Sequence, residues 1–120
     1  MCFYYNSTMK LKTAKKDIVC YKVSNRQFCG PKTFESFYYH YKYTIGRKAS
    51  KRTPLKIKFT SWNKRTGIIN RGFHSYIHEP GLPTEQRIKC VIPKGTEYYV
   101  NTRDGSRVST AIKPIEYLKN

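Results

Sequence analysis

Apolar residues occur in short runs of β-branched and aromatic type along this chain of 120 residues, and turn residues separate the runs. This pattern is typical of short β-strands. The clearest runs cover residues 17–23, 87–92 and 98–100. Between the last two, Pro93 fixes φ and Gly95 permits a positive φ, so we predict a sharp corner that joins two strands there.

Residues 55–62 alternate between apolar and polar positions, which predicts a strand with one buried face. Leu55, Ile57 and Phe59 are expected to face the core. The outward positions are Lys56, Lys58 and Trp62. Turn residues at 63–67 then predict a hairpin with return strands after it.

Three further segments complete the predicted fold. Residues 34–43 fit both helical spacing and strict alternation, and their aromatic content favours a strand. Residues 108–118 predict a last strand, placed at an edge because Pro114 interrupts it. Gly72 predicts a β-bulge or a position where another segment approaches the backbone closely. Residues 1–16 form an arm that either packs through its aromatics or stays loose.

These elements predict a mainly β fold, or an α+β fold with one or two short helices. We expect a single small domain of about six or seven short strands over residues 17–120, preceded by the arm.

The large positive charge of the chain indicates an anionic partner. Lys and Arg total 24 against 7 acidic residues, a net charge of +17, and residues 1–60 hold 14 of the basic residues and only 2 acidic ones. No acidic residue lies between Glu35 and Glu79. This segment predicts an anion-binding surface, with nucleic acid or an anionic nucleotide as the partner. Its expected phosphate-binding residues are Lys42, Arg47, Lys48, Lys51, Arg52, Lys56, Lys58, Lys64, Arg65 and Arg71.

Aromatic residues are numerous, with 11 Tyr, 6 Phe and 1 Trp, and several lie beside these cations. Exposed rings next to Lys or Arg can stack on bases while the cations contact phosphates. The expected stacking residues are Tyr39, Tyr41, Tyr43 and Trp62. Alternatively, the tyrosines cover a thin core with their hydroxyls in water. The first interpretation predicts non-enzymatic binding of nucleic acid through a basic, aromatic-interleaved surface.

Catalytic and metal-binding patterns are absent from the sequence. It contains no P-loop, no G-x-G-x-x-G, no G-x-S-x-G and no paired carboxylates in a suitable context. His74 and His78 lie on a strand-like segment, where i and i+4 are about 13 Å apart, so they do not suit a metal ion. We therefore predict no enzyme activity, no cofactor and no metal.

The four cysteines show no C-x-x-C spacing, and Cys20 and Cys90 lie inside apolar strand runs. Buried thiols of this kind are usually inert packing residues. No run reaches transmembrane length and no signal peptide precedes the first strand. The expectation is a protein with reduced thiols in the cytoplasm, without a membrane partner.

Met1–Cys2, the run 17–23 and the run 90–99 together resemble short, uncharacterised proteins of gut bacteria and their phages. This resemblance implies a mobile-element or phage setting, in the host cytoplasm if the chain is phage-encoded. It carries no established activity. The alternative to nucleic-acid binding is a phage-type sponge that sequesters a small or cyclic nucleotide in a basic pocket, where cations from separate strands would meet.

The order of elements also resembles the ADP-ribosyltransferase fold. The early strand would be 17–21, the middle Gly-Phe-x-Ser segment 72–77, and the last strand and turn 90–95. Lys22 stands where that family has its Arg, and Lys89 where it has its catalytic Glu, so the resemblance implies a domain without transferase chemistry. The implied nucleotide pocket consists of Lys22, His74, Ser75, His78, Arg87 and Lys89.

Overall fold

The structure is a computed structural model of the whole chain, and it describes residues 3–24, 33–35, 42–50, 54–77 and 86–118. These residues form strands and turns with no helix, so the predicted mainly β class is confirmed. The described residues contain thirteen short strands rather than six or seven, because several strands have only two residues. Across these ranges, no helix has the length and apolar character needed to cross a membrane.

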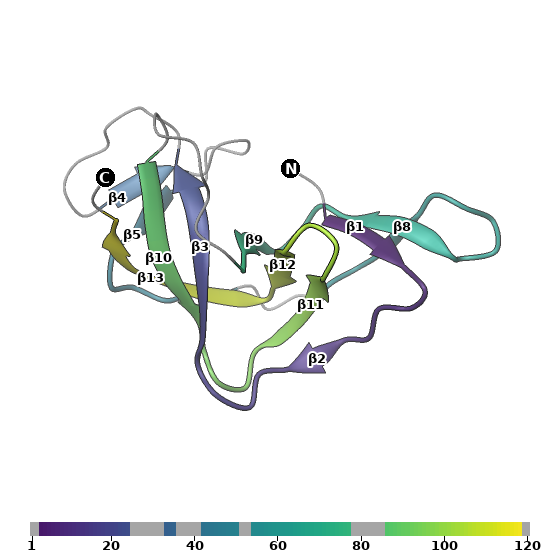
Figure 1. Cartoon of the computed structure of the whole chain (residues 1–120), viewed down its shortest axis with the longest axis horizontal. Coiled ribbons are helices and arrows are strands. Elements are labelled where there is room, and N and C mark those ends of the chain that lie inside the picture. The colour runs from purple at the N-terminus through teal and green to yellow at the C-terminus, as the bar shows by residue number, and fades with distance from the viewer. Residues whose placement is uncertain (1–2, 25–32, 36–41, 51–53, 78–85, 119–120) are drawn as a thin grey trace.

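The strands belong to one large and two small antiparallel sheets (Figure 1). The eight-stranded sheet has the order β2-β11-β12-β9-β3-β10-β13-β6, the three-stranded sheet β1-β8-β7, and the two-stranded sheet β4-β5. The strands are β1 (Phe3–Asn6), β2 (Lys12–Thr13), β3 (Ile18–Ser24), β4 (Thr33–Glu35), β5 (Lys42–Thr44), β6 (Ala49–Ser50), β7 (Lys58–Phe59), β8 (Thr66–Ile69), β9 (Phe73–Tyr76), β10 (Gln86–Ile92), β11 (Glu97–Asn101), β12 (Ser106–Ser109) and β13 (Ala111–Tyr117).

β3 and β10 form the longest antiparallel pair, in register from Ile18↔Ile92 to Ser24↔Gln86. Both were predicted as strands from their apolar runs. Alternation directs one residue in two toward the core, where Cys20 lies opposite Cys90 and Lys22 opposite Ile88. The predicted corner after β10 is also present, with Gly95 at φ +88° before β11 begins.

β13 lies on the other side of β10 and carries Pro114 within its length. The register shifts between Lys89 and Cys90, so Pro114 stands opposite Cys90 at an irregularity, where a missing N–H is tolerated. β6 covers β13 only at Ala111 and Ile112. Beyond that pair, Gly46 N donates to the Pro114 carbonyl oxygen at 2.8 Å. β13 therefore lies between β10 and the short segment 46–50 and is not the outermost strand that its proline predicted.

β3 and β9 meet at a junction between the two halves of the large sheet. Their register joins one pair, Tyr21↔Tyr76. Two long side chains reach across the diverging strands: Lys22 Nζ donates to the His74 carbonyl oxygen. Arg107 on β12 donates from Nη1 to the Val19 carbonyl oxygen at 3.0 Å. These two hydrogen bonds supply donors to the His74 and Val19 carbonyl oxygens, which lie outside the single strand pair.

The core consists of two clusters. The first includes Cys20, Ile88, Cys90 and Ile112 beneath β3, β10 and β13. The second lies under β1 and β8 and contains Phe3, Ile69, Tyr99 and Val108.

Gly72 lies beside the second cluster, and side chains of that cluster approach its backbone closely, as predicted. It adopts φ +131°, and an added Cβ would lie 2.7 Å from Val108 Cγ2 and 2.8 Å from Leu55 Cδ2.

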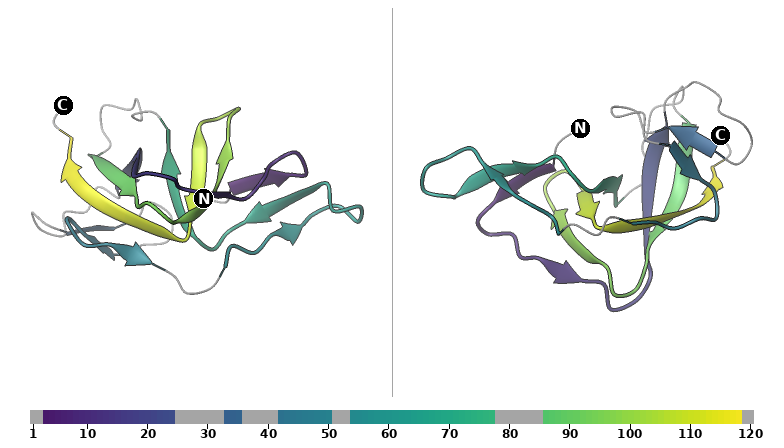
Figure 2. Two further views of the ribbon diagram at one scale, coloured as in Figure 1. Left: turned by 90° about the horizontal axis from the view of Figure 1, so that it is seen from below. Right: turned by 180° about the vertical axis from the view of Figure 1, so that it is seen from behind.

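The three-stranded sheet forms one end of the molecule, opposite β10 and β13 (Figures 1 and 2). Its β7–β8 hairpin projects beyond the body. The turn covers residues 60–65 and so only overlaps the predicted 63–67, because Thr66 and Gly67 already belong to β8. β1 pairs with β8, and Phe3 is fully buried, so residues 3–6 pack rather than form a loose arm.

One orientation predicted for residues 55–62 is wrong. Leu55 and Ile57 pack on the second core cluster as expected, but Phe59 is 41% exposed. Its ring makes an edge contact with Tyr5, at 6.1 Å between centroids. The hydrogen-bonded strand begins only at Lys58, so the alternation over 55–62 does not belong to one continuous strand.

Candidate functional site

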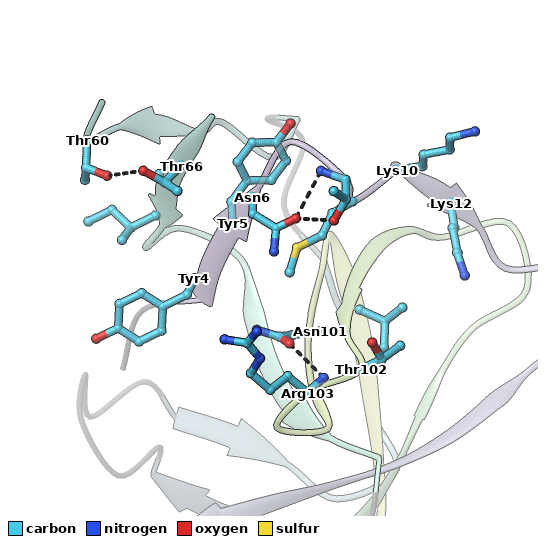
Figure 3. A pocket seen from close by; sticks show the side chains of 15 residues that line it. Tyr4, Tyr5, Asn6, Lys10, Lys12, Thr60, Thr66, Asn101, Thr102 and Arg103 are labelled. Carbon is cyan, nitrogen blue, oxygen red and sulfur yellow. Dashed lines mark hydrogen bonds between the residues drawn. The ribbon is translucent and has the colours of Figure 1, made fainter. Parts of the chain in front are cut away.

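A groove of about 690 Å³ lies between the three-stranded sheet and the β2–β11 end of the large sheet (Figure 3). Its walls come from segments far apart in the sequence: β1 and the residues after it, the base of the β7–β8 hairpin, and the β11–β12 turn. The lining residues are Tyr4, Tyr5, Asn6, Thr8, Met9, Lys10, Lys12, Thr60, Thr66, Gly67, Ile68, Val100, Asn101, Thr102 and Arg103.

Three cations line this groove, and none of its lining residues is Asp or Glu. Lys10 and Lys12 come from the segment that enters β2, and Arg103 from the β11–β12 turn. All three are exposed. The remaining polar groups on the walls are hydroxyls and amides, so the groove presents positive charge and neutral hydrogen-bonding groups to a ligand.

A tight turn after β1 places Lys10 at the groove. The Asn6 side-chain oxygen accepts from the backbone N–H of Thr8 at 3.0 Å, and the Asn6 carbonyl accepts from Met9 N at 3.0 Å. Ser7 N donates to the Arg65 carbonyl at 2.8 Å and ties the turn to the hairpin. Asn side chains favour such turns because they accept bonds from the backbone two residues on.

The opposite wall uses a second Asn-initiated turn. Asn101 Oδ1 accepts from Arg103 N at 3.0 Å, and the Asn101 carbonyl accepts from Gly105 N at 2.9 Å. Figure 3 shows Arg103 in this turn, across the groove from Tyr4 and Asn6. Both basic walls are therefore held by local side-chain to backbone hydrogen bonds.

The base of the β7–β8 hairpin closes the groove toward the projecting end. Thr60 Oγ1 and Thr66 Oγ1 lie 3.2 Å apart within hydrogen-bond distance. Gly67 permits close strand approach, because an added Cβ would lie 2.7 Å from Ile57 Cγ2 and 2.8 Å from the Lys58 carbonyl oxygen. The groove thus runs directly into the hairpin.

A row of aromatic rings connects the core with the hairpin along the same side. Tyr5 makes edge contacts with Tyr99, at 5.8 Å between centroids, and with Phe59. Lys64 Nζ lies 6.0 Å from the centroid of the Phe59 ring. Tyr4, the neighbouring residue on β1, is mostly exposed at the groove.

The predicted phosphate-binding cations are separated in space. All of those in the described residues are exposed, and they are Lys42, Arg47, Lys48, Lys56, Lys58, Lys64, Arg65 and Arg71. Lys58, Lys64 and Arg65 belong to the projecting hairpin, whereas Lys42 lies on β5 at the other end of the molecule (Figure 1). The described part of the acid-free segment therefore does not form one track. Lys51 and Arg52 lie outside the described residues.

The predicted stacking role is wrong for Tyr43. Its ring is only 5% exposed, packs in the first core cluster and contacts Phe73 at 6.0 Å between centroids. Its position on β5 directs the side chain inward, so it serves the core as the alternative interpretation allowed. Trp62 is exposed, as predicted. Tyr39 and Tyr41 lie outside the described residues.

The nucleotide pocket implied by the second resemblance is not assembled as predicted. Lys22 is 6% exposed and Ser75 is buried, whereas Arg87 and Lys89 lie at alternate positions of β10. Because neighbouring strand residues point to opposite faces, Arg87 and Lys89 face away from the side that Lys22 occupies. His74 Nε2 lies 3.1 Å from the Ile69 carbonyl. His78 is outside the described residues.

The buried groups around Lys22 have strongly altered acidity. Burial lowers the pKa of Lys22 to about 8, and burial raises the pKa of both the Cys20 and Cys90 thiols. Both thiols are free and fully buried. Among the residues that the structure describes, no group of three or more His, Cys, Asp or Glu side chains is placed to hold a metal ion.

The three groove cations are not predicted by any pattern in the sequence. Lys10 and Lys12 were part of the arm, and Arg103 was part of a polar turn. The turn signals at Asn6 and Asn101 were visible, but their proximity depends on the pairings of β1 with β8 and of β2 with β11, which join distant segments.

Comparisons with protein-family models, with curated proteins and with solved structures give no match to this chain. The resemblances to gut-bacterial and phage proteins and to the ADP-ribosyltransferase fold therefore stay predictions.

Proposed function

We propose that this protein binds nucleic acid, without turnover, along the groove and the adjoining β7–β8 hairpin. The observation that supports the proposal most is the placement of Lys10, Lys12 and Arg103 along a groove whose lining contains no carboxylate. Cations held beside neutral hydroxyl and amide groups suit phosphates and sugars, which dominate the contacts of nucleic-acid complexes.

The continuity of the groove with the hairpin favours a polymer over a mononucleotide. Thr60 and Thr66 belong to both features, and the hairpin continues the positive charge through Lys58, Lys64 and Arg65. The molecule extends 46 Å along its longest axis, with the hairpin at one end. A strand lying in the groove would therefore meet further cations beyond it.

A small anionic nucleotide is the second candidate, and the groove volume supports it. Ligand pockets usually measure about 300–1,000 Å³, a range that includes this groove. The three groove cations would then contact the phosphates of one molecule, as a nucleotide sponge would. In either case the protein is proposed to act as a binder in the cytoplasm, the setting that the sequence favours.

Salt-dependent binding tests the first candidate. We expect oligonucleotide binding, measured by fluorescence anisotropy, to weaken steeply with added salt. The triple variant Lys10→Gln, Lys12→Gln, Arg103→Gln should flatten the slope of log K against log salt by about 2 for a single strand, because each phosphate contact contributes about 0.7.

A variant with the same loss of charge elsewhere is the control. Lys16, Lys94 and Lys113 are exposed and do not line the groove, so their replacement by Gln should change the slope less. Equal slopes for the two triple variants would show that net charge, not the groove, governs binding. Binding of nucleotides in a thermal-shift panel, without binding of oligonucleotides, would favour the sponge instead.

A further inference from the structure

Trp62 is the most exposed large hydrophobic residue in the described chain. Its side chain is 95% exposed, against 37–67% for the other exposed large hydrophobic residues. It lies in the connection between β7 and β8, on the hairpin that projects from the body (Figure 1). An indole this exposed makes little contact with the fold, so its faces are accessible to a ligand.

The turn that carries Trp62 is fixed by hydrogen bonds. Ser61 Oγ accepts from Arg65 N at 3.1 Å and from Thr66 N at 3.2 Å, and the Ser61 carbonyl accepts from Lys64 N at 3.1 Å. Lys64 completes the turn in the left-handed region, at φ +58°. Because the turn is held in one conformation, contact with a ligand costs little ordering of the backbone.

The chemistry around Trp62 indicates what it contacts. Lys64 and Arg65 follow it within three residues, and Lys64 also lies over Phe59. No acidic residue occurs between Glu35 and Glu79. A flat apolar ring beside cations matches a nucleobase joined to its phosphate, since the base can stack on the indole while the cations contact the anion.

We propose that Trp62 stacks on an unpaired base, so that the protein selects single-stranded over double-stranded nucleic acid. This inference rests on the proposed function, because the groove is needed to hold the strand that supplies the base. In a duplex the faces of the bases are already stacked on their neighbours. An indole on a short hairpin reaches a base face most readily in an unpaired strand.

The chain contains one tryptophan, so its emission reports on this residue alone. We expect oligothymidine to quench the emission in parallel with the anisotropy increase, and a duplex with the same number of phosphates to bind more weakly and quench less. Trp62→Ala should weaken single-strand binding by about tenfold or more. Trp62→Phe, which keeps an aromatic face, should retain most of the affinity.

The outcomes separate the two proposals. Binding of oligothymidine without quenching, or with equal affinity for Trp62→Ala, would overturn the stacking inference and leave the proposed function standing. Tighter binding of the duplex would also overturn it. No binding of either oligonucleotide at low salt would overturn both proposals. A blue shift with vesicles of phosphatidylglycerol, without any response to oligonucleotides, would assign the indole to a membrane surface and overturn both.

Discussion

The ammonium group of Lys22 lies 4.9 Å from the centroid of the Tyr43 ring, inside the first core cluster. The same group donates to the His74 carbonyl oxygen across the β3–β9 junction. A buried cation is costly unless it is bonded, and here a ring face and a backbone carbonyl both stabilise it. Lys22 is therefore part of the fold, which explains why it is not available to a ligand.

The buried Lys22 should make stability depend on pH. Its pKa in the folded state is about 8, below the ordinary value of 10.5, so the folded protein loses this proton before the unfolded chain does. The free energy of unfolding should therefore rise with pH above about 8. Relative to Lys22→Met, the natural protein should gain about 1 kcal/mol between about pH 7 and pH 9, measured by urea denaturation.

The window between pH 7 and pH 9 keeps the opposing effect of the thiols small. Cys20 and Cys90 have raised pKa values, so their contribution to stability falls only as pH rises past their ordinary value of 9.0. The Lys22 charge itself lowers both thiol pKa values, so the comparison with Lys22→Met is made below pH 9. Parallel stability curves for the two proteins would contradict the assignment of a buried, charged Lys22.

Cys20 and Cys90 should not react with thiol reagents in the folded protein. Both are fully buried, and burial raises their pKa, so little thiolate forms and reagents have no access to it. In a Cys2→Ser, Cys29→Ser background, Ellman's reagent should detect no thiol until denaturant is added, and then both. Rapid reaction in the folded state would disprove the burial of this pair.

Gly72→Ala should destabilise the fold through both conformation and packing. An added methyl group would meet Val108 and Leu55 within 2.8 Å, and φ is +131°. We expect a loss of about 2 kcal/mol or more in chemical denaturation. Gly95→Ala is the control, since Gly95 also has a positive φ but no heavy atom lies within 4 Å of an added Cβ. Equal losses would show that packing at Gly72 contributes nothing.

Substitution of Phe3 should lower the stability of the fold, whereas substitution of its neighbour Tyr4 should weaken oligonucleotide binding. Phe3→Ala removes a buried ring that contacts Tyr99 and should cost about 3–5 kcal/mol. Tyr4 points to the other side of β1 and is mostly exposed at the groove, so Tyr4→Ala should cost less than about 1 kcal/mol while it weakens oligonucleotide binding. A large loss of stability in Tyr4→Ala would contradict this division.

The sequence predicts the central strands because β3 and β10 are rich in β-branched and other apolar residues. It predicts the close approach at Gly72 because a glycine within a strand pattern signals close contact with a neighbouring segment. It does not predict the groove, whose walls meet through pairings such as Phe3↔Ile69 and Glu97↔Thr13. No local pattern encodes such pairings. The alternation over residues 55–62 also predicts the wrong orientation for Phe59. Alternate residues share a face only within one continuous strand, and the strand here begins at Lys58.

The junction between β3 and β9 has a consequence for motion. Among the described residues, the backbone ladder across this junction has one strand pair, Tyr21↔Tyr76. The side-chain bonds of Lys22 and Arg107, and the packing of Phe73 and Tyr98 on the first core cluster, give further contacts between the half that contains β10 and β13 and the half that contains β11 and β12. Amide protons should therefore exchange as two cooperative groups, and those of the long β3–β10 ladder should be protected longest. The half that contributes Lys12 and Arg103 to the groove can then open and adjust while the β3–β10 ladder stays closed.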